Sequence, residues 1–371
     1  MRGVKPWGMC IILLTGVLVG PISAQVLSPA EQAEGFVSLF NGQDLSGWNI
    51  EGTKEAWSVQ NGLITCDGRG SGWLRSDWEY EDFILRLEWR ISPGGNSGVF
   101  FRCARGGAPW TTGHEVQILD DAGKVDLHGS GSLYGNVKPS ANPTKGAGEW
   151  NAYEIRCQGK HITVIVNGTL VVEVNQEEVP ALKEKPLRGY IGLQNHGSKV
   201  EFRNLRIKEI GYRPLFNGRD LTGWKVEGAG EWSVEDGMIF FSGRGRDLWT
   251  TEEFTDFVLR VEWKIKPGGD SGIYLRGSSK SQVNIWENPV GSGEIHGYRV
   301  NPTKRMDRPP GEWNLFEITV RGNKVSVWFN GEVVIKEAEL VGMPPKGPLA
   351  LQSHGHPIWF RNIRIKVLKS Q

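Results

Sequence analysis

The stretch HITVIVNGTLVV at residues 161–172 decides the fold of this chain, and a second version of it, KVSVWFNGEVVI, stands at residues 324–335. In each stretch, two runs rich in β-branched residues flank an Asn-Gly pair. Asn and Gly accept the positive φ angles that a type I′ turn needs at both central positions, so the pattern predicts a β-hairpin. We therefore expect the same antiparallel hairpin twice in one chain.

The sequence around the two hairpins is repeated as well. Both copies run through Leu-Phe-Asn-Gly, Gly-Trp, Trp-Ser-Val, a strand-like run that ends in Glu-Trp, and Phe-Arg-Asn, in this order. A unit of roughly 160–175 residues is long enough to bury its own core. We predict a signal peptide at 1–24, an N-terminal segment at 25–35, a first domain at 36–210 and a second at 211–371.

The remaining pattern indicates β-strands throughout. Residues 83–89 and 257–263 alternate apolar and polar side chains, which is typical of strands with one buried face. Pro-Gly-Gly turns at 93–95 and 267–269 are read as tight turns between strands, and no window shows a sustained helical period. Each copy is therefore predicted to be an antiparallel β-sandwich or jelly roll, in an all-β protein.

The N-terminal residues read as a secretory leader. Arg2 and Lys5 precede an apolar run at 9–19, and Ile22-Ser23-Ala24 offers a small-residue cleavage site. We expect a secreted or periplasmic protein, cleaved near Ala24, with no membrane partner afterwards. Without the leader the formal charge changes from +1 to −1, and no basic run suggests nucleic acid.

Cysteine and tryptophan usage narrows the possibilities further. The three cysteines after the leader, Cys66, Cys103 and Cys157, all lie in the first copy, which favours buried thiols and leaves one disulfide as the alternative. Of the 16 tryptophans, those that recur in both copies are predicted to be scaffold. Because aromatic faces stack on sugar rings, four tryptophans without a counterpart are candidates for a ligand surface. These are Trp73, Trp110, Trp249 and Trp286.

The most reactive segment is HEVQILDD at residues 114–121. Alternation places Glu115 and Gln117 on one face of a strand, and a single bulge after Gln117 would add Asp120 to that face. Paired carboxylates can transfer protons, although an exposed polar strand face explains the same residues. The second copy has Gln282, Asn284 and Glu287 at the matching positions, so its first carboxylate is lost.

Further candidates follow from chemistry and spacing. Lys145 lies on an Asn-Pro-Thr-Lys loop, Arg102 follows a Ser-Gly-Val-Phe-Phe strand, and His196 stands two residues after Gln194. Histidine is the natural proton carrier near neutral pH, but a solvated lysine and a structural histidine are the plainer interpretations. The other candidates are Tyr134, Trp150 and Asn151 in the first copy, and Arg276, His296, Lys304, Gln352 and His354 in the second. No P-loop, dinucleotide fingerprint or Gly-x-Ser-x-Gly motif is present.

Taken together, these motifs resemble the 3-keto-disaccharide hydrolase domain family. The resemblance rests on the opening Leu-Phe-Asn-Gly motif and on residues 96–102, 115–120, 148–151 and 202–204, and both copies match. It implies two tandem concanavalin-like jelly rolls, in bacterial secreted or periplasmic proteins that act on oxidised sugars. The acidic strand also resembles that of glucanases with this fold. Gln117 departs from an acid there, which argues against a standard retaining mechanism.

The resemblance also implies a reaction. A ketone at C3 of a glycoside acidifies the C2 proton, whose removal expels the C1 substituent before water adds. Glu115, Asp120 or His196 would be the base, and Lys145, Arg102 or a bound divalent metal would stabilise the enolate.

Gln117, Tyr134, Trp150, Asn151 and Gln194 would bind the sugar. We expect a hydrolase or lyase for 3-keto-glycosides, with its main site in the first copy and carbohydrate as its partner. The alternative is a non-catalytic tandem glycan-binding module, because fold does not determine function.

Overall fold

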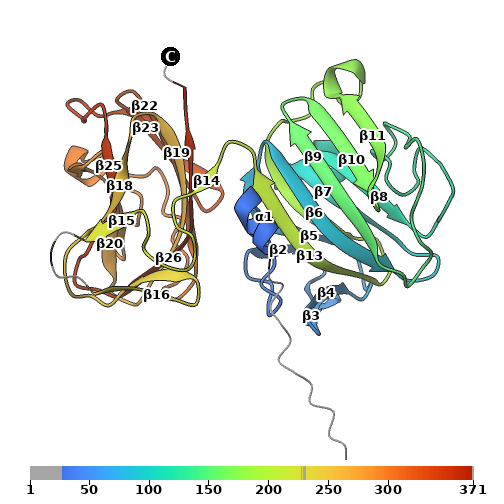
Figure 1. The fold of residues 1–371 in the computed structure, drawn as a ribbon, viewed down its shortest axis with the longest axis horizontal. Coiled ribbons are helices and arrows are strands. Elements are labelled where there is room, and N and C mark those ends of the chain that lie inside the picture. The colour runs from blue at the N-terminus through green and yellow to red at the C-terminus, as the bar shows by residue number, and fades with distance from the viewer. Residues whose placement is uncertain (1–26, 227, 229–230, 370–371) are drawn as a thin grey trace, which may run out of the picture.

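The structure is a computed structural model that describes residues 27–226, 228 and 231–369. The predicted leader at 1–24 lies outside the described residues. Figure 1 shows two β-rich halves side by side, joined by a short connection after β13 (Val200–Glu209). The all-β prediction is confirmed, since helices are few and short.

The first half is built from antiparallel strands joined by loops. Its strands are β1 (Val37–Ser38), β2 (Trp48–Gly52), β3 (Trp57–Gln60), β4 (Leu63–Cys66), β5 (Gly72–Tyr80), β6 (Phe83–Ile91), β7 (Asn96–Cys103), β8 (His114–Leu119), β9 (Asn151–Gln158), β10 (His161–Val166), β11 (Thr169–Asn175), β12 (Gly189–Asn195) and β13. Its helices are α1 (Pro29–Glu34) and α2 (Pro109–Thr112), with 3-10 turns η1 (Lys54–Ala56) and η2 (Gln176–Glu178).

The second half repeats this arrangement. Its strands are β14 (Arg213–Pro214), β15 (Trp224–Val226), β16 (Trp232–Glu235), β17 (Met238–Phe241), β18 (Leu248–Phe254), β19 (Phe257–Ile265), β20 (Asp270–Leu275), β21 (Ser278–Trp286), β22 (Asn314–Arg321), β23 (Lys324–Phe329), β24 (Glu332–Glu339), β25 (Gly347–Leu351) and β26 (Ile358–Val367). One 3-10 turn, η3 (His296–Tyr298), follows β21.

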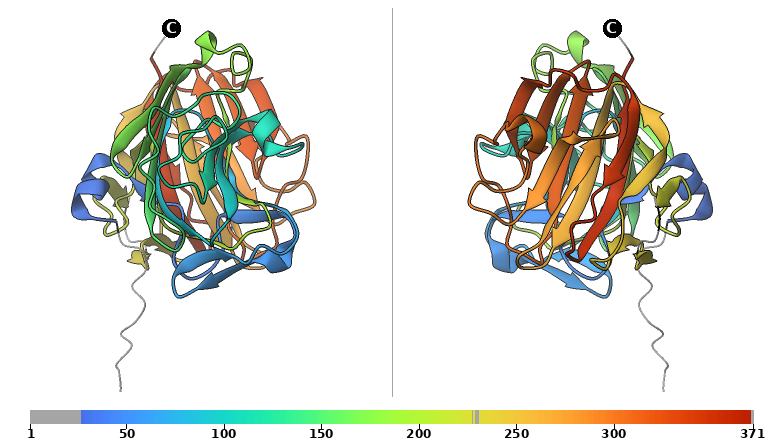
Figure 2. Two further views of the ribbon diagram at one scale, coloured as in Figure 1. Left: turned by 90° about the vertical axis from the view of Figure 1, so that its right-hand side faces the viewer. Right: turned by 90° about the vertical axis from the view of Figure 1, so that its left-hand side faces the viewer.

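Each half is a sandwich of two antiparallel sheets, and Figure 2 shows the strands of the two halves from the two ends of the molecule. In the first half a long sheet, β11-β10-β9-β6-β13-β4-β3 with β1 added on β13, packs on a short sheet, β2-β5-β12-β7-β8. The second half has the matching sheets β24-β23-β22-β19-β26-β17-β16 and β15-β18-β25-β20-β21. The two tandem concanavalin-like jelly rolls expected from the sequence are therefore present.

Local sequence explains these elements. Strand β6 alternates buried and partly exposed residues along its whole length, because its odd positions face the core between the sheets. Asn167 and Gly168 have φ values of 48° and 83°, and Asn330 and Gly331 have 46° and 103°, which confirms both predicted hairpins. The turn at 93–95 differs from a hairpin turn, since it joins β6 in the long sheet to β7 in the short sheet.

The three cysteines are free, buried thiols, as the plainer prediction held. Burial raises the pKa of Cys66 to about 11 and that of Cys157 to about 12, so both stay protonated. Among the described residues, none of the helices has the length and apolar character needed to cross a membrane.

The two halves pack directly on each other. The rings of Trp78 and Trp328 stack with centroids 5.2 Å apart, and the indole nitrogen of Trp78 donates to Glu262 at 3.0 Å. Residues from β19, β22, β23 and β26 take part, which means that the long sheet of the second half faces the first half. Its short sheet consequently lies on the far side, at the outer edge of Figure 1.

Candidate functional site

A cavity of about 650 Å³ opens on the outer face of the short sheet in the first half. The sheet supplies its floor through β2, β5, β7 and β12, and the segment that contains α2 forms one wall. Its lining residues are Glu51, Gly70, Ser71, Gly72, Trp73, Phe100, Arg105, Gly107, Ala108, Pro109, Trp110, Gln194, Asn195, His196 and Gly197. Two of the four tryptophans proposed for a ligand surface, Trp73 and Trp110, therefore line it.

Strand register brings the chemically active residues to this face. Phe100 pairs with Glu115, and Gly98 pairs with Gln117, so these four positions share one side of the sheet. Gln194 pairs with Trp73 on the next strand. The result is a set of aromatic, amide and carboxyl groups on one outward face, as alternation along residues 114–119 predicted.

Glycines in the floor make room for two of these side chains. A Cβ atom on Gly98 would lie 2.2 Å from the Glu115 Oε1 atom, and a Cβ on Gly192 would lie 2.1 Å from the Trp73 ring. Neither distance is compatible with a side chain at the glycine unless its neighbour moves. Gly98 and Gly192 thus allow the carboxyl group and the indole to lie flat against the sheet.

Glu115 is a buried acid at this site. It is 5% exposed, and burial raises the pKa of its carboxyl group to about 8, although a hydrogen bond with Gln194 and the charge of Lys185 oppose that rise. A neutral carboxylic acid is therefore the main form at pH 7. Such an acid can donate a proton, and its carboxylate can accept one close to neutral pH.

Amide groups surround this carboxyl. The end of the Gln117 side chain lies 3.2 Å from Glu115 Oε1 and 3.1 Å from Asn96 Oδ1. Gln194 is 6% exposed, and its Oε1 atom has no hydrogen-bond partner within the described part of the chain. An unpartnered buried acceptor beside a cavity is a ready position for a ligand hydroxyl.

His196 lies at the rim of the cavity, two residues beyond Gln194, and is solvent-exposed. Tyr134 lies beside Glu115 across the edge of β8, where its backbone N–H donates to the Glu115 carbonyl at 3.0 Å. Its ring is 38% exposed and packs edge-on against His128. The structure thus brings Glu115, Gln117, Gln194, His196 and Tyr134 to one face.

Asp120 does not join this group. The predicted bulge after Gln117 was wrong, because β7 and β8 stay in unbroken register from Asn96–Leu119 to Phe101–His114. Asp120 follows the end of β8, and its Oδ2 atom accepts the Gly94 N–H at 2.8 Å. Its carboxylate therefore closes the turn between β6 and β7.

Arg102 also points elsewhere. Its side chain is fully buried and donates to the carbonyl oxygens of Glu81 and Gly159, at 2.7 to 3.0 Å. Arg102 has a φ of 53°, a backbone conformation that turns the end of β7 away from regular strand geometry. The guanidinium is committed to the backbone of neighbouring turns, so the expectation that it reaches a ligand beside Glu115 is not met.

Three more candidates lie outside the cavity. Lys145 is exposed on its loop, and Asn151 holds that loop by accepting the Lys145 N–H at 2.8 Å. The Trp150 ring lies against the guanidinium groups of Arg203 and Arg90, at 4.0 and 4.9 Å. These arginines belong to the long sheet, which means that the end of the loop before β9, which carries Trp150, packs on the opposite layer.

The second half keeps the scaffold of the site with different chemistry. Gln282 replaces Glu115, and its Nε2 atom donates to Gln352 Oε1 at 2.8 Å. Arg276 repeats the burial of Arg102, with bonds to the Thr255 and Gly322 carbonyls. Glu287 closes the 267–269 turn as Asp120 closes the first, and Lys304 forms an exposed ion pair with Glu332. Asn284, His296 and His354 lie on the outer face of the short sheet or at its edge.

Sequence reasoning missed four charged residues around the first cavity, Lys185, Arg75, Glu51 and Arg105. Lys185 donates to the Trp110 carbonyl at 2.8 Å and lies close enough to Glu115 to affect its pKa. Arg75 binds Glu51 at 2.8 Å beside the cavity, and Arg105 lines it. None of these residues belongs to a repeated motif, so the sequence carried no signal that would have identified them.

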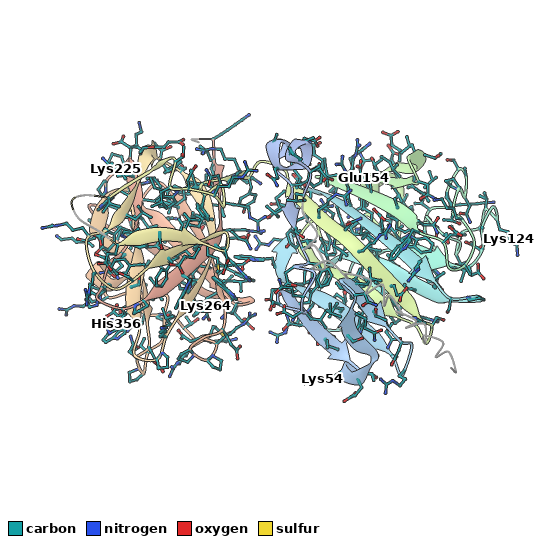
Figure 3. The ribbon with its side chains drawn as sticks, turned by 60° about the horizontal axis from the view of Figure 1, so that its bottom comes forward. Lys54, Lys124, Glu154, Lys225, Lys264 and His356 are labelled. Carbon is teal, nitrogen blue, oxygen red and sulfur yellow. The ribbon has the colours of Figure 1, made fainter. Side chains whose placement is uncertain are left out.

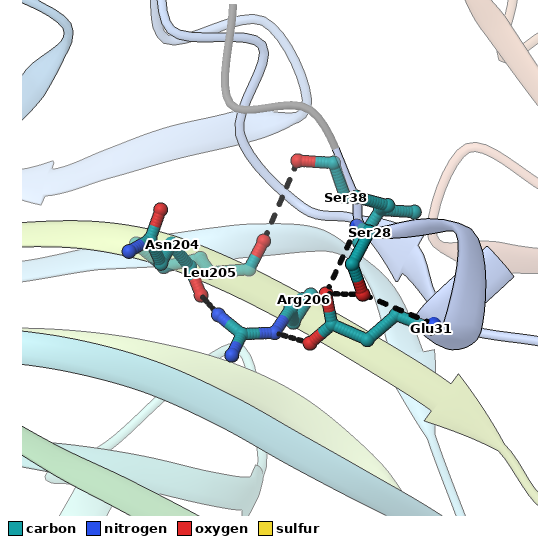
Figure 4. A pocket seen from close by; sticks show the side chains of 7 residues that line it. Ser28, Glu31, Ser38, Asn204, Leu205 and Arg206 are labelled. Atoms are coloured by element: carbon teal, nitrogen blue, oxygen red, sulfur yellow. Dashed lines mark hydrogen bonds and ion pairs between the residues drawn. The ribbon is translucent and has the colours of Figure 1, made fainter. Parts of the chain in front are cut away.

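Among the described residues, no group of three or more His, Cys, Asp or Glu side chains is arranged to hold a metal, and the divalent metal stays a prediction. A smaller hollow of about 190 Å³ lies beside α1, where Glu31 binds Arg206 and the Ser28 hydroxyl caps the helix (Figure 4). The ion pair between Glu31 and Arg206 holds the N-terminal helix α1 against β13.

Comparison with known proteins places this geometry in a family. The sequence profile of the 3-keto-alpha-glucoside-1,2-lyase-like domain matches residues 35–208 and again 211–366. A protein named 3-keto-disaccharide hydrolase from Bacteroides thetaiotaomicron is 27% identical over 238 residues, which cover 48% of this chain and 79% of that protein.

Solved structures show similar domains. A proposed glycosyl hydrolase from Parabacteroides distasonis is 28% identical, with a TM-score of 0.46 over 50% of this chain and 99% of its own. A carbohydrate-binding module from Bacillus subtilis is 13% identical, with a TM-score of 0.33 over 44% of this chain and 96% of its own. The two profile matches together span nearly all of the described residues, and the chain therefore belongs to the 3-keto-alpha-glucoside-1,2-lyase-like domain family, with two tandem copies of the domain.

Proposed function

We propose that this chain cleaves 3-keto-glycosides in the cavity of the first jelly roll, with Glu115 as the residue that transfers the proton to the leaving group. The observation that carries the proposal is a buried carboxyl group, with its pKa raised to about 8, beside a cavity lined by aromatic and amide side chains. A sugar ring can stack on Trp110, which is 48% exposed, and the amides of Gln194 and Gln117 can bind its hydroxyls.

The ketone at C3 supports elimination as the reaction class. The C2 proton is acidic because the electron pair left by its removal is delocalised onto the C3 oxygen. In the proposed step His196 takes this proton, the electron pair forms the C1–C2 double bond, and the C1–O bond breaks. Glu115 gives its proton to the departing oxygen, so the aglycone leaves as an alcohol and Glu115 becomes a carboxylate.

Water then adds across the C1–C2 double bond, and the proton transfers run in the reverse direction of the elimination. Its oxygen adds to C1 and one proton returns to the Glu115 carboxylate, while the proton held by His196 goes back to C2. The products are then a free 3-keto-sugar and the aglycone. Lys185 supports the ionised form of Glu115 between the two steps, because a nearby cation favours a carboxylate. If product leaves before water adds, the same residues act as a lyase.

Turnover of a defined substrate tests the proposal. Purified protein is incubated with 3-keto-trehalose or an aryl 3-keto-glucoside, and release of the sugar or the aglycone is followed by NMR. We expect Glu115→Gln to lower kcat by about 10²- to 10⁴-fold. Glu287→Gln, which alters only the carboxylate that closes the 267–269 turn, is the matched control and should retain turnover.

Two results would count against this function. Absence of turnover on every 3-keto-glycoside, with and without added divalent metal, would exclude the enzyme reading for these substrates. Glycan binding that survives both Glu115→Ala and His196→Ala, combined with an inactive wild type, would favour the tandem binding module instead.

We also propose that residues 1–24 direct export of the protein and are removed near Ala24. The N-terminal sequence of protein recovered from the periplasm or medium of a bacterial host tests this. Recovery of the uncleaved chain in the cytoplasm alone would contradict it.

A further inference from the structure

The short sheet of the second half differs from that of the first half by more than the replacement of Glu115 with Gln282. It carries ionisable residues at four places where the first half has neutral ones: Asp270 for Asn96, Glu294 for Ser132, His296 for Tyr134 and His356 for Ser198. The backbone confirms the second of these matches. The Gln117 N–H donates to the Ser132 carbonyl at 3.1 Å, and the Asn284 N–H donates to the Glu294 carbonyl at 2.9 Å.

These residues gather on the outer face of the sheet. Asp270 pairs with Trp286 and Gly272 pairs with Asn284 across β20 and β21, so their side chains share one face. His354 Nδ1 lies 3.2 Å from Asp270 Oδ2, and Asn284 Nδ2 donates to Glu294 Oε2 at 3.1 Å.

One hydrogen-bond acceptor in this cluster has no partner among the described residues. Asn284 is 3% exposed, and its Oδ1 atom is buried without a hydrogen-bond partner in the described part of the chain. The other end of the same amide is bound to Glu294. Since a buried polar atom is normally paired, this oxygen indicates that a donor from outside completes the group.

An exposed aromatic ring flanks the acids. Trp286 is 41% exposed and stands directly opposite Asp270, where the first half has Leu119. An indole face beside carboxylates and an amide suits a ring that carries several hydroxyl groups, since the ring stacks while the hydroxyls donate. Two carboxylates disfavour an anion, and the described residues form no three-ligand metal group.

We infer that the second jelly roll carries a saccharide-binding site of its own, formed by Asp270, Glu294 and Asn284 beside the exposed face of Trp286. His354 holds the Asp270 carboxylate in place. Burial raises the pKa of this carboxyl group, and the nearby His354, His356 and His296 oppose that rise. The binding site is separate from the first cavity, because the short sheet of the second half lies on the side away from the first half (Figure 1). Figure 3 shows His356, one of these histidines, at that outer side.

A local probe can detect binding at this place. The full chain is labelled with ¹⁵N-tryptophan, and the indole N–H signal of Trp286 is assigned with Trp286→Phe. The probes are trehalose, maltotriose and 3-keto-trehalose, added to the Glu115→Gln protein so that the substrate is not consumed. We expect at least one of them to shift the Trp286 signal saturably.

Two variants test the acids without disturbing the scaffold. Asp270→Asn and Glu294→Ser each introduce the residue that the first jelly roll has at that position, so the fold has already accepted them. Each should weaken binding by about 10-fold, because a charge-assisted hydrogen bond is replaced by a weaker one or lost. Glu235→Gln, an exposed acid at the end of β16, is the control and should bind like the parent.

Three results would each overturn the inference. No shift of the Trp286 signal with any of the three saccharides would overturn the inference, and so would unchanged affinity in the Asp270→Asn/Glu294→Ser double variant. A saturable shift with Mg²⁺ or Ca²⁺ alone, and none with saccharide, would overturn it in favour of a cation site. Turnover is measured separately, so loss of the proposed function leaves this binding result intact.

Discussion

At the residue scale, burial changes the pKa of the Glu115 carboxyl group and with it the proton transfers that this group can perform. The carboxyl group lies among Phe100, Gln117 and Gln194, and burial is the largest influence on its pKa. The position itself does not require an acid, since Gln282 occupies it in the second half with a good hydrogen bond to Gln352. Burying an acid lowers stability at a position where a neutral amide also fits, and a residue of this kind is typical of functional positions.

The first prediction concerns the pH dependence of stability. The folded pKa of Glu115, about 8, exceeds its ordinary value of 4.5, so the folded state binds one more proton than the unfolded state between these values. The contribution of Glu115 to stability is therefore complete below about pH 4.5 and is lost as the pH rises to about 8. Glu115→Gln should remove this dependence, worth about 4 kcal/mol between pH 4 and 8.

Urea unfolding of wild type and Glu115→Gln at several pH values measures this difference. Gln282→Ala, at the matching place in the second half, is the control and should leave the pH dependence of the wild type unchanged. Parallel pH curves for wild type and Glu115→Gln would show that the carboxyl group is already ionised at pH 7.

The second prediction is a pH profile of activity. If Glu115 is the acid for the leaving group, kcat/KM should fall as the pH rises through about 8, because the proton it must donate is then absent. Steady-state rates on an aryl 3-keto-glucoside with a poor leaving group measure this limb. A substrate whose leaving group needs no proton should show no such fall, and an equal fall for both substrates would assign the limb to another residue.

At the element scale, the floor of the cavity depends on where β7 and β12 have glycine. Gly98 leaves room for the Glu115 carboxyl, and Gly192 leaves room for the Trp73 ring. The residues next to these glycines, Val99 in β7 and Ile191 and Leu193 in β12, are buried in the core, so the gaps lie on the outward face. The same device occurs in β20, where Gly272 makes room for Gln282.

The third prediction follows from this floor. Gly98→Ala should displace the Glu115 side chain and lower kcat by about 10-fold or more, since a shift of about 1 Å in a reacting group can cost much of its effect. The fold should survive, because the atom in the way is the end of a side chain. Gly272→Ala, the matched change in the second half, should leave turnover intact, and equal losses in both variants would point to a general defect in folding.

At the scale of the whole molecule, the interface between the halves is built on buried charges. Glu209, at the end of the first half, binds both Arg260 and Arg364 of the second, and Glu317 binds Arg260 and Arg188. At the β23–β24 turn of the second half, a Cβ atom on Gly331 would lie 3.5 Å from the Tyr190 hydroxyl and 3.8 Å from a guanidinium nitrogen of Arg105, which lines the first cavity. The second half thus supports one end of the first site.

The fourth prediction concerns this network. Glu209→Gln leaves two buried guanidinium groups without their shared partner, which should cost about 3–5 kcal/mol. Calorimetry should then resolve two unfolding transitions, one for each half, in place of a joint one. Glu173→Gln, which removes an exposed partner of His161, should change stability by less than about 1 kcal/mol. A single unshifted transition in Glu209→Gln would mean that the halves are not coupled through Glu209.

The fifth prediction concerns acid. Burial alone would raise the pKa of Glu317, but Arg260 and Arg188 outweigh it and lower the pKa to about 2. The stabilisation by Glu317 is thus present above about pH 4.5 and is lost as the pH falls towards 2. Small-angle scattering should give one fixed separation of the halves at pH 7 and at pH 4, and a broader distribution near pH 2. Variable separation at pH 7 would contradict the fixed arrangement.

The sequence by itself determined the strands, the turns and the duplication. Asn-Gly pairs, alternating burial and repeated motifs are local signals, because a turn needs particular residues and a strand has a period of two. This local period also put Glu115 and Gln117 on the correct common face.

Only the tertiary structure decided which of the candidates meet. It committed Arg102 to backbone carbonyls, Asp120 to a turn and Trp150 to the other layer, and it brought Lys185 and Arg75 to the site from segments without a motif. The physical reason is that neighbours in a jelly roll come from strands far apart in the chain, and long-range pairing leaves no trace in a local pattern.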